Sequence, residues 1–127
     1  MFNGRIAVPS EEKGGINGVR SGHFGHCNVF TLIDVENGQI INTSTIQNKE
    51  HAQGGCMVPV NLLEKHKVDA LIVGGIGMRP LMGFRHAGID VYYETQRPDE
   101  IESVVKDLIE GKLNLIENKQ VCGGNDD

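Results

Sequence analysis

The sequence predicts a mixed α/β domain, a five-stranded sheet with helices on both faces. In the second half, short apolar runs rich in β-branched residues alternate with helical patterns. In the first half, two strand patterns flank the turn signal Glu36-Asn37-Gly38, which favours a hairpin. The 17 glycines mark many tight turns. A hairpin followed by right-handed crossovers gives a mixed sheet.

The predicted element order is β-β-β-α-β-α-β-α. The expected strands are residues 4–8, 27–35, 39–46, 69–73 and 89–93, and the expected helices are residues 56–65, 80–88 and 98–111. Pro59 fits the first turn of the first helix, and Pro80 starts the second. The last helix has the clearest pattern, because apolar residues recur along it at a spacing of 3.6 and Gly111 ends it. We therefore expect one domain over residues 1–113 and a flexible C-terminal tail over residues 114–127.

This topology predicts where a ligand would bind. If the strand at residues 27–35 is antiparallel, the loops at residues 9–26, 47–55, 74–79 and 94–97 lie at one edge of the sheet. Open α/β sheets bind ligands at that edge, near the point where the strand order reverses.

Composition excludes several classes of function. The formal net charge of −5 argues against a nucleic-acid binder. No apolar run approaches the roughly 20 residues of a membrane span, and the first residues lack a signal-peptide pattern. We therefore expect a cytoplasmic protein with reduced thiols. Cys27, Cys56 and Cys122 then become candidate ligands.

Two short segments combine histidine with cysteine. Residues 21–27 read SGHFGHC and supply His23, His26 and Cys27, while residues 51–56 read HAQGGC and supply His51 and Cys56. Imidazole and thiolate suit Zn, Cu, Fe and iron–sulfur clusters. Cys56 begins a helix, whose dipole favours the thiolate. The alternative is that these are surface histidines and small core cysteines, the commoner fate of isolated examples. Side-chain alternation allows Cys27 to face either the pocket or the core.

A second candidate site is a glycine-rich turn between a buried strand and a helix. Gly74, Gly75, Ile76 and Gly77 would let backbone N–H groups approach an anion, and Arg79 could pair with it. The turn lacks the spacing of a dinucleotide fingerprint and the lysine of a P-loop. The alternative is a plain strand-to-helix turn.

Catalytic machinery is hard to assemble from these residues. There is no G-x-S-x-G motif and no acidic cluster for two metal ions. Asp34 and Asp69 fit turn or cap positions, and a pair formed by Cys56 and His51 lacks an oxyanion donor. The sequence favours a binding protein over an enzyme.

The chain resembles the dinitrogenase iron-molybdenum cofactor biosynthesis family of the NifX and NifB C-terminal type, over about residues 4–113. The resemblance rests on GRIAVPSE, HFG, HAQGGC and VDALIVGGIGMRPLMGFRHAGIDVY. It implies a ribonuclease-H-like fold and a small carrier, not an enzyme. The implied cargo is an iron–molybdenum cofactor, its precursor, or another metal–sulfur cluster of iron–sulfur or molybdenum–copper type.

The resemblance also implies site residues and partners. His23, His51 and Cys56 would be ligands, with the turn at residues 74–77 shaping the pocket. His26 and Cys27 stand where relatives commonly have Arg and Ala, which adds possible ligands. Expected partners are proteins that donate and accept the cluster, and the chain would be a monomer or weak homo-oligomer. The alternatives are a nuclease on the same fold and a thiol-dependent module that binds a small anion.

Overall fold

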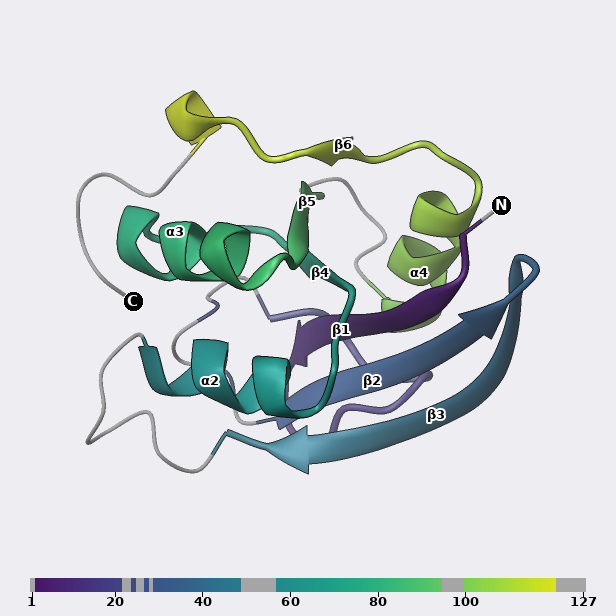
Figure 1. Cartoon of the computed structure of the whole chain (residues 1–127). Coiled ribbons are helices and arrows are strands. Elements are labelled where there is room, and N and C mark those ends of the chain that lie inside the picture. The colour runs from purple at the N-terminus through teal and green to yellow at the C-terminus, as the bar shows by residue number, and fades with distance from the viewer. Residues whose placement is uncertain are drawn as a thin grey trace.

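One mixed sheet organises the molecule (Figure 1). The computed structural model describes residues 2–21, 24, 27, 29–48, 57–94 and 100–120. Within these residues, the sheet has six strands in the order β3-β2-β1-β4-β5-β6. Helices α2 (Met57–Lys65) and α3 (Met78–Ala87) cover one face, and α4 (Ile101–Ile109) covers the other. None of the helices that the structure describes is long and apolar enough to cross a membrane.

The strand directions confirm the predicted hairpin and crossovers. The strands are β1 (Gly4–Ser10), β2 (Val29–Glu36), β3 (Gln39–Gln47), β4 (Ala70–Val73), β5 (Asp90–Tyr93) and β6 (Asn114–Leu115). Strands β1, β4 and β5 run parallel, while β2 is antiparallel to β1 and β3 is antiparallel to β2. The element order through α4 is the predicted one.

The expectation of five strands was wrong, because β6 adds a sixth at the edge beside β5. Leu115 pairs with Tyr92, the N–H of Ile116 donates to the carbonyl of Val91 at 2.9 Å, and Ile116 is only 4% exposed. The folded part therefore extends past residue 113, through the short helix η2 (Asn118–Gln120). A two-residue strand is too short for sequence periodicity to reveal. Residues 121–127 of the expected tail lie outside the described residues.

Alternation along the central strands builds two apolar layers. Ala7 and Leu71 point to the side of α2 and α3, whereas Ile6, Val8 and Ile72 point to the side of α4. Strands β1 and β4 are therefore apolar on both faces. The apolar stripe predicted for the last helix is buried against the second layer, through Ile101, Val104, Val105 and Leu108. Both layers hold the strand ends in a fixed arrangement.

Candidate functional site

The strand ends that carry the predicted ligand segments meet at one edge of the sheet, as expected. The carboxyl ends of β1, β4 and β5 lie there because these strands are parallel and in register, with Val73 opposite Tyr93. The start of β2 and the end of β3 reach the same edge, because Val29 pairs with both Ser10 and Gln47. We call this the carboxyl edge, and the turn at residues 74–77 starts from it at the end of β4.

Most predicted metal ligands fall outside the described residues. His23, His26, His51 and Cys56 are among them, and so is Cys122. Within the described ranges, no group of three or more His, Cys, Asp or Glu residues is placed to hold a metal ion. Cys27 is the one predicted metal ligand among the described residues.

The side chain of Cys27 lies in the core. It is 2% exposed and belongs to the apolar layer beneath α2 and α3. The Nδ2 atom of Asn48 donates to the Cys27 carbonyl at 3.1 Å and lies 3.8 Å from the Cys27 Sγ. Burial raises the pKa of the thiol from 9.0 to about 11, so it stays protonated near neutral pH. This environment favours the structural alternative for Cys27 over a role as ligand.

Phe24 anchors the HFG segment beside α3, a role that sequence reasoning missed. Its ring is fully buried, edge-on to Phe84 of α3 at 5.3 Å and tilted against Phe30 of β2 at 5.6 Å. Aromatic pairs at such distances prefer these tilted and edge-on arrangements. The segment that carries two predicted ligands is therefore tied to the core at Phe24.

The glycine-rich turn is a compact connection between β4 and α3. Ile76 is fully buried and packs in the core, so only the backbone of this residue could contact a ligand. Gly77 is the N-cap of α3, with φ −77° and ψ 164°, and it offers no capping side chain. The first N–H groups of α3 thus lack a side-chain cap, which leaves a helix N-terminus with its favourable charge near the carboxyl edge.

Gly74 makes room for an arginine that sequence reasoning did not single out. A β-carbon at Gly74 would overlap the guanidinium of Arg20 and would stand 2.9 Å from its Cζ atom. Arg20 is 6% exposed, and it reaches this position because it forms a bridge with Ser10 at the end of β1. The next residue, Ser21, donates its N–H to the carbonyl of Pro9 at 2.7 Å. No local pattern marks Arg20, since a loop arginine is usually solvated.

Arg20 places a permanent positive charge inside the carboxyl edge. An arginine side chain stays protonated in proteins. An acidic residue, Glu94, is also 6% exposed at this edge, where its N–H donates to the Val73 carbonyl at 2.9 Å. Because a buried charge is costly unless it is compensated, the buried side chains of Arg20 and Glu94 both contribute to the electrostatic potential at the carboxyl edge.

The model of the dinitrogenase iron-molybdenum cofactor family matches residues 4–111. The chain belongs to this family. It is 33% identical over 115 residues to the uncharacterized protein MJ0580 of Methanocaldococcus jannaschii, covering 89% of this chain and 92% of that protein. Membership makes it a protein related to the iron–molybdenum cofactor.

Solved structures share the fold. The crystal structure of PH0822 is 28% identical, with a TM-score of 0.71 over 90% of this chain and 97% of that chain. The apo form of the orange protein from Desulfovibrio gigas is 19% identical, with a TM-score of 0.80 over 91% of this chain and 94% of that chain. The second likeness shows the fold alone.

Arg79 was predicted to pair with a bound anion, and it is exposed on α3. It lines a groove of about 440 Å³ between α2 and α3, together with Glu64, Met82 and His86. Arg79 lies in the first turn of α3, and its side chain is accessible to solvent. The side chain of Arg20, by contrast, is buried.

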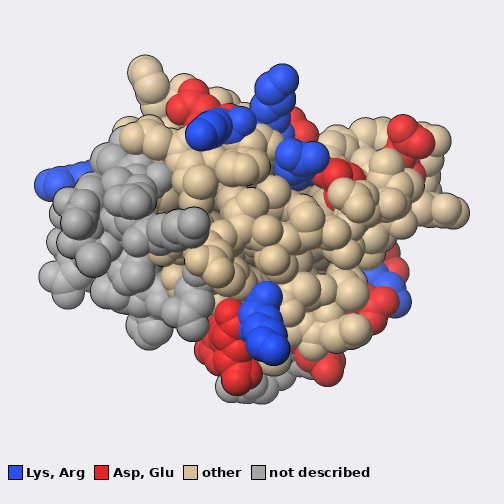
Figure 2. Space-filling view, turned by 90° about the horizontal axis from the view of Figure 1, so that it is seen from below, with Lys and Arg blue, Asp and Glu red and all other residues tan. Residues whose placement is uncertain are grey.

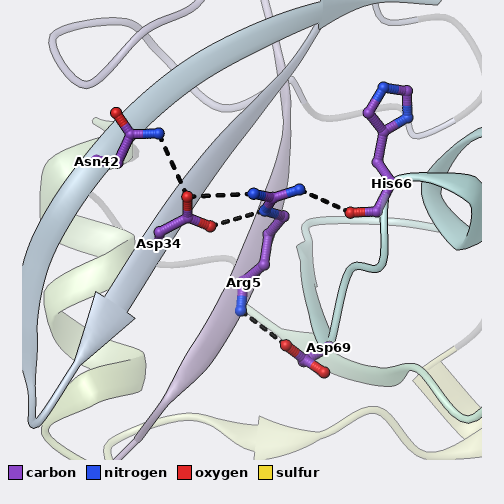
Figure 3. A network of polar contacts seen from close by, with 5 residues as sticks. All are labelled: Arg5, Asp34, Asn42, His66 and Asp69. Atoms are coloured by element: carbon purple, nitrogen blue, oxygen red, sulfur yellow. Dashed lines mark hydrogen bonds and ion pairs between the residues drawn. The ribbon is translucent and has the colours of Figure 1, made fainter.

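Asp34 and Asp69 lie toward the edge of the sheet opposite the carboxyl edge, because Asp34 pairs with Arg5 near the start of β1 and Asp69 directly precedes β4. Figure 3 shows both in contact with Arg5. Arg5 donates to both oxygens of Asp34, at 2.7 and 3.2 Å, and its backbone N–H donates to Asp69 at 2.8 Å. Arg5 Nη1 also donates to the carbonyl of His66 at 2.8 Å. The hydrogen bonds from Arg5 lower the pKa of Asp34. Through Arg5 these carboxylates link β1 to β2 and to the start of β4, so both have a structural role.

Proposed function

We propose that this protein is a carrier for an iron–molybdenum cofactor, its precursor or a related metal–sulfur cluster, and that it is not an enzyme. The observation that carries the proposal is the convergence at the carboxyl edge. The strand ends next to both His/Cys segments meet there, beside the turn at residues 74–77 and the buried Arg20. The strand order, with β2 antiparallel to β1, supports a ribonuclease-H-like fold for this single cofactor-binding domain.

The residues suit such a cargo chemically. His23, His26, His51 and Cys56 would supply imidazole and thiolate ligands. Metal–sulfur clusters of this kind are anionic, and the uncapped start of α3 favours an anion. The turn at residues 74–77 would contact the cluster through its backbone, and Arg79 could approach it from solvent. We leave Cys27 out of the ligand set because its thiol is buried and protonated.

A carrier exchanges its cargo with other proteins. The partners would be a protein that donates the cluster and a protein that accepts it. We place this exchange in the cytoplasm, because thiolate ligands require reducing surroundings.

The first prediction tests the cluster ligands. The apo-protein is incubated with tetrathiomolybdate, with and without Fe²⁺ or Cu⁺, passed over a desalting column, and its visible spectrum recorded. We expect a retained chromophore near one cluster per chain. Cys56→Ser should weaken retention at least about tenfold because it removes a coordinate bond. Cys122→Ser is the matched control and should bind like the parent.

Circular dichroism of each variant separates loss of ligand from loss of fold. A parent protein that retains no chromophore would contradict the carrier function. If Cys122→Ser loses the cluster while Cys56→Ser keeps it, the ligand set belongs to the C-terminal residues instead. Phosphodiester cleavage by the parent that disappears in Asp34→Asn would favour the nuclease alternative.

A further inference from the structure

Strand β3 is a long edge strand whose side chains are mostly exposed, apart from Ile40 and Ile46, which pack against the core. Seven of its nine side chains are exposed, and the exposed fraction of Ile41 reaches 60%. Within the described residues, β3 pairs only with β2, and its outer edge faces away from the sheet (Figure 1). Such an edge presents a row of backbone N–H and C=O groups that another strand can bind.

This edge lacks the charged residues and prolines that often prevent pairing. Natural edge strands carry charged residues, especially lysine, or proline. Strand β3 reads QIINTSTIQ and contains neither, although 23% of the whole chain is charged. Figure 2 views the molecule from the side on which β3 lies, and a broad uncharged band crosses this face between charged margins. A partner strand would meet no charge along β3.

The sequence of β3 is nearly its own reverse. When two copies pair antiparallel about a two-fold axis at Thr43, Gln39 faces Gln47 and Ile40 faces Ile46. Asn42 then faces Ser44, Thr43 faces its own copy, and only the pair of Ile41 with Thr45 is unlike in polarity. Cross-strand pairs of like polarity stabilise antiparallel strands, and a two-fold interface requires such a self-complementary surface. Strand β3 is therefore largely complementary to a second copy of itself.

We propose that two copies of this chain pair through β3 into a two-fold dimer with one continuous sheet. The pairing should be weak for two reasons. A contact between single strands lies at the low end of interface size. Strand β3 also bulges at Ile41, which has no partner in β2 between the pairs Asp34–Asn42 and Val35–Ile40, and a bulge increases the local twist and limits edge pairing. We expect dissociation in the micromolar range or above.

The dimer leaves the carboxyl edge accessible. The proposed axis passes through the middle of β3, at the flank of the sheet, whereas the glycine-rich turn follows β4. Dimerisation therefore does not depend on the proposed carrier function.

The second prediction tests this interface by sedimentation equilibrium of the full chain, from about 1 μM to about 1 mM, a range that brackets a weak interface. The parent should rise from the monomer mass of 13.9 kDa toward twice that value. Thr43→Lys and Thr43→Glu should each weaken dimerisation at least about tenfold, because the axis places like charges opposite each other. An equimolar mixture of the two variants should dimerise again. Asn114→Lys, an exposed position on the opposite edge strand β6, is the control and should behave like the parent.

Several results would overturn the proposal. A parent that stays monomeric over the whole range would do so, and this result needs no variant to fold. Dimerisation of Thr43→Lys as tight as that of the parent would place the interface elsewhere. Two folded, monomeric variants that fail to associate when mixed would refute the axis at Thr43. Dissociation caused by Asn114→Lys would assign the contact to β6.

Discussion

At the residue scale, the main finding is the contact between Gly74 and Arg20. Residues 54 positions apart in the chain meet there because the bridge between Ser10 and Arg20 brings the loop after β1 to the end of β4. The glycine was expected to admit a ligand, and the structure shows that it admits a buried guanidinium. Gly74 therefore leaves the space that the buried guanidinium of Arg20 occupies.

The third prediction is a double-mutant cycle on this contact. Gly74→Ala should lower the free energy of unfolding by about 1 to 3 kcal/mol, because the added β-carbon displaces Arg20. In an Arg20→Ala background the same substitution should cost less, since the overlapping group is gone. Urea unfolding of the four proteins measures the coupling. Equal costs in both backgrounds would show that Arg20 does not occupy the space at Gly74.

The buried thiol of Cys27 gives the protein a stability that depends on pH. Burial raises its folded pKa from 9.0 to about 11, while the unfolded chain keeps the ordinary value. Below pH 9 the Cys27 thiol is protonated in both the folded and the unfolded state, so its ionisation does not reduce the free energy of unfolding. As the pH rises from 9 towards 11, the unfolded state ionises first, so the stability falls.

The fourth prediction is this loss of stability. The free energy of unfolding of the parent should fall by up to about 2 to 3 kcal/mol between pH 9 and 11, beyond the change seen in Cys27→Ala. Urea titrations at several pH values in this window measure it, and groups common to both proteins cancel in the comparison. Parallel pH profiles for the two proteins would mean that the thiol ionises without cost in the fold.

At the scale of elements, the long amphipathic segments were predicted and the short edge strand was not. Helix α4 was recognisable because its apolar residues recur over several turns. Strand β6 has two residues, both exposed, and it exists because β5 offers an edge and Ile116 has a place in the core. Arg85 of α3 also donates to the carbonyl of Ile116 at 3.1 Å, which fastens β6 to the helix layer.

The fifth prediction concerns this fastening. Ile116→Ala should lower the free energy of unfolding by about 2 to 4 kcal/mol, because it empties a position that is 4% exposed. Leu115→Ala is the matched control, since Leu115 is 54% exposed, and its effect should stay within about 0.5 kcal/mol. Guanidinium unfolding of the three proteins provides the comparison. Equal effects of the two substitutions would mean that residues 114–116 contribute nothing to the core.

At the scale of the whole molecule, the sheet separates three kinds of surface. The carboxyl edge gathers the strand ends next to the His/Cys segments, the glycine-rich turn and Arg20. The opposite edge holds Asp34 and Asp69 in contact with Arg5, which joins distant strands and leaves these carboxylates in structural roles (Figure 3). The outer flank at β3 is uncharged and open. Cargo binding and self-association can therefore occupy different parts of one small domain.

The sequence by itself determined the family, the order of the described elements through α4 and the edge at which the strand ends next to the predicted ligand segments meet. These follow from local signals, because periodicity, glycine and proline act within a few residues, and crossover handedness then arranges the strands. Only the tertiary structure decided that Cys27 faces the core, that Arg20 is buried against Gly74, and that residues 114–115 form a sixth strand. Each of these depends on contacts between residues far apart in the chain, whose energy exists only once the sheet and its two apolar layers have formed.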